Sequence, residues 1–531
     1  MFSLSYAALV AIAAWALYRI SCIGRRPKNF PPGPPTIPVL GNLHLMPASD
    51  PHVKFEEWAK KYGPVYSLML GTKTMVVLSK DTAVKDLLDK KGAIYSSRPD
   101  LYIGQTLASG GQRMLMMRYG PEWRIRRSSH NALHIKQAVK YIPYQELESK
   151  QLIYDMMQAP SNLKEHYRRF ASSLITSVVF GFRWKTFEER GLQHFFHLFD
   201  KFVALNKTGG AAFPDFFPIL RYLPSWLSAA QRVASEHHKE EMEMFKGHWM
   251  TAKHKIQNKT LSAQSCAAGD LLQMQQEEGF SDEFAAYQTG TFFEAGSDTT
   301  SSELYAFAQA MVLYPEVQRR AQAELDSIVG DNRYPNMEDM PSLPYIRACI
   351  KETLRWMPTG TLGAAPHATT EDDYYQGYFI PRDSAVVLNV WAINRDSERH
   401  PNPARFEPER YLGDDLSAMD SAGHPDPTKR DHFTFGAGRR VCVGMHVAER
   451  SMFLAIATTL WAFDITPKKD SDGRPVLPKQ DVFEQGFVTL PKVFEAEIKP
   501  RSEKRAAYIK EEWEQAKRGL DGEGQYLVNP I

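Results

Sequence analysis

The residues with the clearest chemical potential lie near the C-terminal end of the chain, in the loop FGAGRRVCVG that spans residues 435–444. Its one cysteine, Cys442, precedes an apolar helical pattern that runs from Met445 to about Trp461. A cysteine at such a position meets unpaired N–H groups and the positive end of the helix dipole, which favour the metal-binding thiolate. Arg440 could hold a carboxylate through a forked pair of hydrogen bonds. The loop therefore predicts a thiolate metal ligand beside a carboxylate anchor.

This loop has two other interpretations. A free cysteine is commonly a small buried hydrophobic residue without a chemical role. The run Gly436-Ala437-Gly438 also begins like a dinucleotide-binding fingerprint, but that fingerprint needs glycine or alanine where Val441 stands, and a buried strand before it. Residues 431–435, DHFTF, make a poor buried strand. Glycine lets the backbone approach a flat ligand closely. The glycines of this loop therefore favour the interpretation in which Cys442 binds a metal ion held in a flat ligand.

A second chemical stretch lies in a long predicted helix over residues 282–313. Ser281 can cap its start, acidic residues fill its first turn, and Pro315 marks its end. About 32 residues at a rise of about 1.5 Å give roughly 48 Å, which is enough to cross a whole domain.

The middle of this helix reads AGSDTT over residues 295–300. A glycine inside a helix costs up to about 1 kcal/mol relative to alanine, so Gly296 needs another reason. Small residues at Ala295 and Gly296 would let a flat ligand approach the backbone. The Thr299 hydroxyl can bond back into the preceding turn and bend the helix, and Asp298 supplies an acid beside it. A polar helix face is the alternative explanation of the Asp–Thr pair.

Two side-chain pairs at helical spacing accompany these stretches. Trp123 and Arg127 are four apart on one helix face, which by itself fits a Trp–Arg stack on a surface helix equally well. Glu352 and Arg355 are three apart, and such a pair alone is most often a surface ion pair worth under about 1 kcal/mol. Neither pair is specific without the cysteine loop.

Taken together, these patterns resemble the cytochrome P-450 family. Residues 435–444 fit F-x-x-G-x-R-x-C-x-G at every fixed position, and residues 295–300 fit the oxygen-binding motif A/G-G-x-D/E-T-T/S. Residues 352–355 fit E-x-x-R, and FEPERY at 406–411 matches the segment that supplies its second arginine. The resemblance covers nearly the whole chain. It implies a mostly α fold with a small β region, and haem b held between the long helix and the cysteine loop.

The resemblance also assigns roles to individual residues. Cys442 would be the axial iron ligand, and Asp298 with Thr299 would relay protons to bound oxygen, where a positioned donor is needed. Glu352, Arg355 and Arg410 would form a buried structural group near the cysteine loop. The remaining residues that the resemblance places around haem are Trp123, Arg127, His367, Phe435, Gly436, Arg440, Gly444, Ala295 and Gly296.

The elements that position these residues follow from the rest of the sequence. Residues 1–23 begin with an uncharged apolar stretch followed by basic residues, which predicts an N-terminal transmembrane helix with the rest of the chain on the cytosolic side. A buried core helix is the alternative. Residues 24–42 form a basic, proline-rich hinge, residues 43–500 the haem-thiolate catalytic domain, and residues 501–531 a charged, helix-prone tail.

Smaller features within the catalytic domain have predictions of their own. Val65–Leu70 and Thr74–Ser79 flank a turn and predict a hairpin, and strands return at Tyr378–Ile380 and Ala385–Trp391. The proline-broken apolar stretch 213–227 cannot be one helix; by position it resembles the family's lid connection, and a loop packed on the core is the alternative. Residues 485–487, QGF, resemble the family's C-terminal substrate turn.

Composition limits the function classes. A net charge of +2 gives no reason to expect nucleic-acid binding, and the four scattered cysteines fit a reducing compartment rather than a disulfide framework. The sequence contains no flavin or iron–sulfur motif, so electrons would come from another protein. The resemblance implies NADPH-cytochrome P-450 reductase as that partner, with cytochrome b5 as a further candidate.

The function that follows is a membrane-bound monooxygenase of the endoplasmic reticulum. It would insert one oxygen atom from O₂ into a small, largely hydrophobic substrate, by hydroxylation or epoxidation, and it resembles fungal members of secondary metabolism. Two alternatives are a family member that rearranges its substrate without O₂, and a non-catalytic haem-binding sensor. The expected cavity residues are Leu101 to Met117, Ala295, Thr299, Thr359 to Leu362 and Phe487. Two sequons, at Asn206 and Asn258, are expected to carry no glycan.

Overall fold

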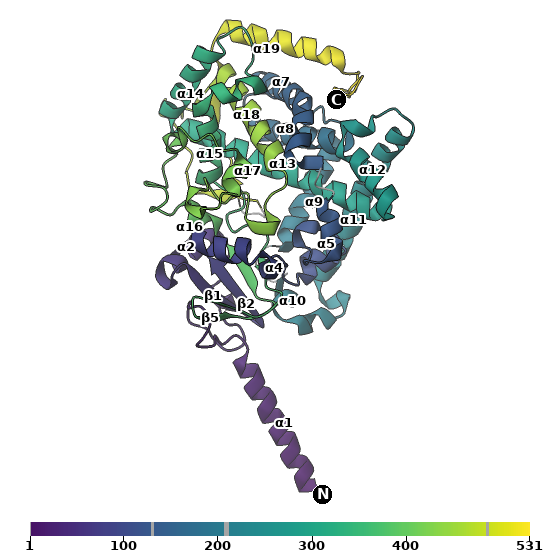
Figure 1. Cartoon of the computed structure of the whole chain (residues 1–531), viewed down its shortest axis with the longest axis vertical. Helices are drawn as coiled ribbons and strands as arrows, with labels where there is room; N and C mark the ends of the chain where they lie inside the picture. Colours follow the sequence, from purple (N-terminus) through teal and green to yellow (C-terminus); the bar gives the residue numbers. More distant parts are fainter. Residues whose placement is uncertain (1, 129–131, 207–211, 485–487) are drawn as a thin grey trace.

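Helices make up most of this molecule, as the computed structural model shows for residues 1–531 (Figure 1). The structure describes all residues except 1, 129–131, 207–211 and 485–487. The main sheet lies at one end of the globule, and helices form most of the rest. The prediction of a mostly α fold with a small β region is therefore confirmed.

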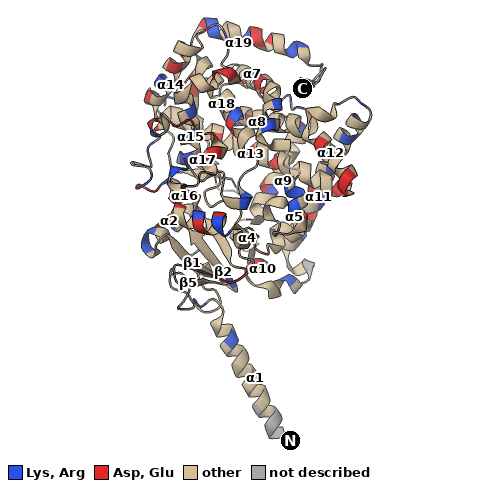
Figure 2. Ribbon diagram, in the orientation of Figure 1, with Lys and Arg blue, Asp and Glu red and all other residues tan. Residues whose placement is uncertain are grey.

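The first helix, α1 (Phe2–Cys22), stands away from the globule and exposes large apolar side chains such as Leu9 and Trp15 (Figure 1). The last turn of α1 carries the basic residue Arg19, and basic colour marks this end of the helix in Figure 2. In the part of the chain that the structure describes, no helix is long and apolar enough to cross a membrane. The helix predicted over residues 1–23 is present, but the predicted transmembrane span is not supported.

The proline-rich segment after α1 lies against the sheet rather than standing free as a hinge. Ser67 of β1 (Val65–Leu70) donates its N–H to the Pro32 carbonyl at 2.7 Å. Arg26 donates to the carbonyls of Gly33 and Ser67 at 2.9 Å each. These hydrogen bonds join the segment to the globule, and the fixed φ angles of its prolines make it stiff.

The main sheet has the strand order β1-β2-β6-β3. Strand β2 (Lys73–Leu78) pairs antiparallel with β1 and parallel with β6 (Ala385–Leu388), and β3 (His367–Ala368) pairs antiparallel with β6. The predicted hairpin is confirmed. The strand predicted through Trp391 ends at Leu388, because the Asn389 side chain caps the short helix α16 (Val390–Asn394) by accepting from the Ala392 N–H at 3.3 Å.

Helix α13 (Asp282–Leu313) crosses the centre of the globule and is buried along most of its length. Its bounds agree with the prediction, and the Ser281 hydroxyl caps it by accepting from the Phe284 N–H at 3.2 Å. Helix α8 (Leu163–Phe180) and helix α11 (Ala229–Gln257) pack against it. Because a Cβ on Gly296 would lie 2.6 Å from Ile175 of α8, this glycine permits the close packing of the two helices.

The segment 213–227 is broken into α10 (Phe213–Phe216), η8 (Pro218–Tyr222) and η9 (Ser225–Leu227), as the prolines predicted. Other short elements that bear on the site are η3 (Tyr102–Leu107), η4 (Met114–Met116), η12 (Pro408–Tyr411) and η14 (Gly438–Arg440). Further helices of the N-terminal half are α2 (Pro51–Tyr62), α3 (Asp81–Val84), α4 (Gly92–Tyr95), α5 (Pro121–Ser128), α6 (Ile135–Ala138), α7 (Ile142–Gln158), α9 (Arg190–Asn206) and α12 (Ala267–Glu278).

The C-terminal half adds the helices α14 (Pro315–Ile328), α15 (Pro344–Trp356), α17 (Ala418–Ala422), α18 (Met445–Ala462) and α19 (Glu503–Ala516). Three two-stranded sheets complete the fold, made from β4 (Asp373–Tyr375), β5 (Tyr378–Ile380), β7 (Phe463–Pro467), β8 (Phe483–Glu484), β9 (Leu490–Pro491) and β10 (Ala496–Pro500).

The C-terminal tail is an integral part of the globule. Figure 2 shows acidic and basic residues mixed along α19, and beyond it the chain returns to the core. The Tyr526 hydroxyl lies 2.8 Å from that of Ser177 on α8, and Tyr144 of α7 donates to Asn529 at 2.8 Å. Gln525 exchanges hydrogen bonds with the backbone of Arg183 at 3.1 and 2.8 Å. Residues 522–531 therefore act as a strap over α7 and α8.

Candidate active site

The cysteine loop is held in one conformation by its own backbone and by its neighbours. Gly436 and Gly438 have φ angles of +76° and +62°. A Cβ on Gly438 would lie 2.2 Å from the Leu88 carbonyl oxygen, so only glycine fits there. The Gly438 N–H donates to Asp89 at 2.9 Å, and the Cys442 N–H donates to the Phe435 carbonyl at 2.8 Å. The loop thus presents Cys442 at the start of α18.

The Cys442 side chain is exposed, yet protein surrounds its sulfur closely. Burial raises the pKa of the Cys442 thiol, while the N–H groups of Gly444 and Met445 and the charge of Arg127 act in the opposite direction. The thiolate preference predicted from the helix start is therefore outweighed by burial in the protein alone. A metal ion would supply the missing stabilisation, because a coordinating thiol is deprotonated outright.

Accessible space also adjoins the middle of α13. Ala295 is exposed and Thr299 partly exposed, although most of the helix around them is buried. The Thr299 hydroxyl donates to the Ala295 carbonyl at 2.6 Å, as predicted for a threonine that bonds back into the helix. The neighbouring Gly296 has Ile175 in the place where its side chain would be, so its contact with a cofactor stays a prediction.

The acid of this motif is buried beside a cation. Asp298 is 4% exposed, and its carboxylate lies 3.7 Å from the guanidinium of Arg168 on α8. Burial raises the pKa of Asp298 to about 6, although the charge of Arg168 opposes the rise. A carboxyl group whose pKa lies near neutral can both give and take a proton.

A group of cations gathers between the cysteine loop and the segments after α4 and in α5. Arg440 donates to the carbonyls of Ser96 at 2.8 Å and Met117 at 2.7 Å, and its guanidinium lies 4.3 Å from the Trp123 ring centroid. Burial, with the charges of Arg98 and Arg127, lowers the pKa of Arg440 to about 8. This buried positive charge favours a bound anion.

Two further observations point to an anion at the same place. The fully buried Arg98 has a pKa lowered by burial to about 9; within the described residues, neither it nor Arg440 has a carboxylate in ion-pair range. The buried Trp123 Nε1–H has no hydrogen-bond partner among the described residues. Unpaired buried donors and cations of this kind fit the carboxylates of a ligand.

His367 and Arg127 lie at the edge of this group. His367 Nδ1 donates to the Tyr95 carbonyl at 2.9 Å, and burial together with Arg98 and Arg440 lowers the pKa of His367 to about 3. The imidazole of His367 is then neutral, and its Nε2 can accept a hydrogen bond. A bound anion nearby would favour protonation of this nitrogen. Arg127 donates to the Val441 carbonyl at 3.4 Å, which places it against the cysteine loop.

The predicted structural group is assembled behind the loop. Glu352 and Arg355 of α15 are fully buried and form a two-bond ion pair at 2.7 and 2.8 Å. Arg410 of η12 reaches the same Glu352 carboxylate at 3.4 Å. Arg355 also donates to the carbonyls of Asn394 and Pro403 at 2.9 Å each, so the pair ties the segments before the loop to α15.

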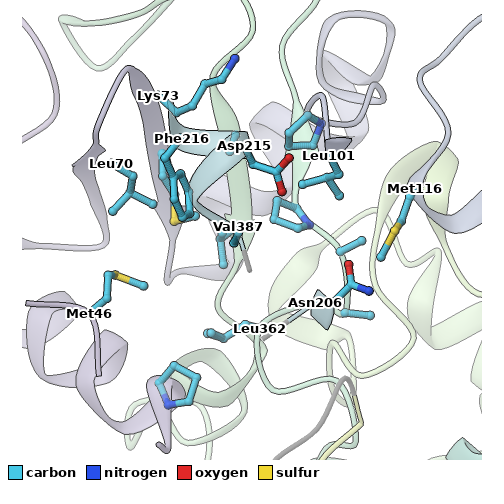
Figure 3. A pocket seen from close by; sticks show the side chains of 18 of the residues that line it. Met46, Leu70, Lys73, Leu101, Met116, Asn206, Asp215, Phe216, Leu362 and Val387 are labelled. Carbon is cyan, nitrogen blue, oxygen red and sulfur yellow. The ribbon is translucent and has the colours of Figure 1, made fainter. Parts of the chain in front are cut away.

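A cavity of about 310 Å³ lies between the main sheet and α10 (Figure 3). Its wall is mostly apolar, with Met46, Leu70 and Val387 on one side and Leu101 and Met116 on another. Polar and charged residues also line it, among them Lys73, Asp100, Arg118, Asn206, Asp215 and Asp383. The cavity lining includes the predicted positions Leu101, Met116 and Gly360 to Leu362, and also residues of α2, β2 and β6 that were not predicted. The predicted positions Ala295, Thr299 and Thr359 are not part of this lining, and neither are the other residues between Leu101 and Met117. Phe487 and its neighbours lie outside the described residues.

Sequence reasoning missed two residues that the structure brings into the site. Arg98 stands in the run SSRP, and its one signal in the sequence is an arginine directly before a proline. Arg168 lies on α8, and nothing in its spacing connects it with Asp298, which is far away in the sequence. Both became visible only because the fold brings α8, α13 and the cysteine loop together.

The residues present fit a haem whose iron is bound by Cys442. Accessible space adjoins both Cys442 and Ala295, and the buried cations with the unpaired Trp123 N–H suit the two propionates of a haem. A mostly helical fold with a thiolate loop and an acid–alcohol motif on a buried central helix defines a haem-thiolate oxygenase.

Comparison with known proteins agrees with this class. The cytochrome P-450 family model matches residues 31–498. The chain is 48% identical to cytochrome P-450 monooxygenase virE of Hypocrea virens, over 97% of this chain and 93% of that protein. It is 46% identical to monooxygenase fogE of Aspergillus ruber and 43% identical to fsoB of Humicola fuscoatra, each over 98% of this chain and 96% of the relative. The chain belongs to the cytochrome P-450 family, and it is a monooxygenase enzyme.

Proposed function

We propose that this enzyme inserts one oxygen atom from O₂ into a small, largely hydrophobic organic substrate, by hydroxylation or epoxidation. Haem b would be the cofactor, and NADPH the electron source, through NADPH-cytochrome P-450 reductase with cytochrome b5 as a further candidate donor. The observation that carries the proposal is Cys442, held at the start of α18 by a loop in which only glycine fits at position 438. When bound, the haem supplies oxygen activation, which thiolate ligation favours.

The chain's own residues have distinct tasks in this proposal. Arg98, Arg440 and Trp123 hold the propionates, with Arg127 and His367 beside them. The N–H groups of Gly444 and Met445 stabilise the sulfur of Cys442 by hydrogen bonding, and hydrogen bonds to a ligand sulfur tune its electron donation. Together they fix the orientation of the cofactor and its charge.

Proton delivery belongs to α13. Asp298, with a pKa raised by burial to about 6, can pass protons from the side of Arg168 toward the Thr299 hydroxyl. Thr299 already uses its proton to bond the Ala295 carbonyl, so its oxygen keeps lone pairs free to accept from a donor on the opposite side. This acid–alcohol pair favours oxygen insertion over a rearrangement without O₂ and over a sensor, since neither alternative needs a proton relay.

The cavity restricts the substrate class. Its volume of about 310 Å³ and its mostly apolar wall suit a neutral molecule of moderate size. The relatives virE, fogE and fsoB are fungal proteins. We place the enzyme in fungal secondary metabolism, with neutral aromatic and polyketide compounds as the substrates to be screened first.

Location at the endoplasmic reticulum membrane, with the globule on the cytosolic side, is part of the proposal. Its support is the exposed apolar surface of α1, joined to the globule through the Arg26 contacts. Expression in a microsomal system with endoglycosidase treatment tests the orientation. Unmodified Asn206 and Asn258 are expected, whereas a glycan on either asparagine would contradict a cytosolic globule.

Isotope labelling tests the reaction itself. The purified enzyme is supplied with NADPH, the reductase, ¹⁸O₂ and each of a panel of neutral aromatic polyketides. A product that gains one ¹⁸O atom is expected, with none from H₂¹⁸O. A product formed without label from ¹⁸O₂ would contradict oxygen insertion and favour the rearrangement.

A further inference from the structure

A buried ionic cluster outside the haem site joins four parts of the chain. Arg113 lies between η3 and η4 and is 3% exposed. Its guanidinium donates to Glu241 of α11 at 2.6 Å and to Glu294 of α13, and its Nε donates to Ser109 at 3.0 Å. The guanidinium carbon also lies 3.7 Å from the ring centroid of Phe202 on α9. One side chain thus contacts α9, α11 and α13 at once.

Arg113 faces two buried carboxyl groups. Although burial opposes it, Arg113 lowers the pKa of Glu241, and Tyr287 and His237 bond the same carboxylate. Burial raises the pKa of Glu294, although the charge of Arg113 opposes the rise. Separating the arginine from Glu241 would leave buried charges without partners, so the closed arrangement is one discrete state.

The cluster touches the walls of the active site at two places. Glu294 directly precedes Ala295 of the oxygen motif on α13. On the other side, Arg113 is followed by η4, whose Met116 lines the cavity. Arg440 of the cysteine loop holds the carbonyls of Met114 and Met117 at 3.3 and 2.7 Å. Residues 113–117 are thus fixed between the ionic cluster and the cysteine loop.

Helices α9 and α11, here named the lid helices, are joined by residues 207–228. Asn206 at the end of α9 lines the cavity on the side opposite Met46 and Leu70, and Asp215 and Phe216 of α10 also line it (Figure 3). Because Val203, Leu205 and Asn206 of α9 line the cavity, a movement of α9 would displace this part of its wall. Arg113 contacts both helices, α13 and the segment that leads into η4. Trp249 and Lys253 of α11 also bond Asp282 at the start of α13, and Phe195 of α9 stacks on Phe293.

We propose that Arg113, with Glu241 and Glu294, is a latch that holds the lid helices closed on α13 and thereby positions the cavity wall at Met116. Arg113 is a positioning residue in this account, since its guanidinium is fully occupied by the cluster. The inference rests on the proposed function for its meaning, because the latch would govern how substrate enters and leaves the cavity.

The test compares haem-loaded wild type with Arg113→Gln, Glu241→Gln and Arg113→Lys. Glu241→Gln keeps the size of the side chain and removes only its charge, which secures a second variant if Arg113→Gln does not fold. Arg183→Gln is the matched control, because it breaks an equally buried pair with Glu148 outside the lid helices. Hydrogen–deuterium exchange is followed in peptides from α9, α11 and residues 109–117, and binding of 4-phenylimidazole to the iron by stopped flow.

Arg113→Gln and Glu241→Gln are expected to raise the exchange rate in those three peptides by about ten-fold or more, and to speed both association and dissociation of the azole. Arg113→Lys should restore part of the protection, and Arg183→Gln should leave all three peptides unchanged. Unchanged exchange in α9 and α11 in folded, haem-loaded Arg113→Gln or Glu241→Gln would overturn the latch. The reduced carbon-monoxide spectrum of the same samples reports the haem-thiolate site separately, so failure of the proposed function is distinguishable.

Discussion

The buried group around Glu352 gives the sharpest stability prediction. Glu352 is fully buried and faces two arginines, with Arg355 at 2.7 and 2.8 Å and Arg410 at 3.4 Å. Its carboxylate also accepts the Glu407 N–H at 2.8 Å. Replacement by glutamine keeps the shape but removes the negative charge, and an amide nitrogen then faces one of the donors.

The expected cost follows from this geometry. Arg355 keeps its bonds to the carbonyls of Asn394 and Pro403, so the loss is mainly that of the counter-charge. Removing one partner of a buried ion pair typically costs about 3–5 kcal/mol. That is a large fraction of a folding free energy of about 5–15 kcal/mol, so Glu352→Gln should be poorly folded or lose haem easily at 37 °C.

Urea unfolding followed by circular dichroism measures this effect. The control is Glu316→Gln, whose pair with Arg405 at 3.1 Å is about half exposed on both sides and should be worth less than about 1 kcal/mol. A Glu352→Gln protein that unfolds within about 1 kcal/mol of wild type would refute the idea that this group stabilises the region of the cysteine loop.

Three further predictions concern the haem contacts, the acid on α13 and the C-terminal strap. Trp123→Phe keeps an aromatic ring beside Arg440 but removes the unpaired N–H, so haem affinity should fall by about ten-fold or more while the apoprotein keeps its stability. Haem transfer to apomyoglobin measures the haem affinity, and thermal unfolding measures the stability of the apoprotein. Unchanged haem affinity would contradict the propionate contact. Asp298→Asn should stabilise the fold at neutral pH by up to about 3 kcal/mol, because burial raises the pKa of Asp298 to about 6 and the ionised carboxylate opposes folding. The gain in unfolding free energy should be complete above about pH 6 and absent below about pH 4. A gain that grew toward low pH would contradict a raised pKa of Asp298. Deleting residues 522–531 removes the contacts of Tyr526 to α8 and of Gln525 to Arg183, so the free energy of unfolding should fall by more than about 3 kcal/mol. The iron spectrum of the folded protein should stay unchanged. An unaltered unfolding midpoint would show that the strap adds no stability.

The long elements were predictable because one local rule dominates each of them. Helix α13 begins at the Ser281 cap and ends before Pro315, and no other part of the chain is needed to set these bounds. The hairpin of β1 and β2 similarly follows from its turn at Gly71. Asn389 shows the limit of such rules, since its capping bond converts the end of a predicted strand into α16.

The pairs within the site were partly predictable from short spacing. Glu352 and Arg355 lie on one helix, so their proximity could be expected, whereas their full burial depends on the segments that cover α15. Arg98 and Arg168 gave no usable signal, because their partners are brought together only by packing of distant segments. Gly296 was assigned to the cofactor side by its motif, and the structure shows Ile175 of α8 as an independent reason for a glycine.

The central claim is that Cys442 binds haem iron as a thiolate. The carbon-monoxide difference spectrum of the reduced protein, recorded beside Cys442→Ser, tests it most directly. The account predicts a far red-shifted Soret band in wild type that is absent from folded, haem-loaded Cys442→Ser. The same band in both proteins, or its absence from well-folded, haem-loaded wild type, would contradict thiolate ligation by Cys442.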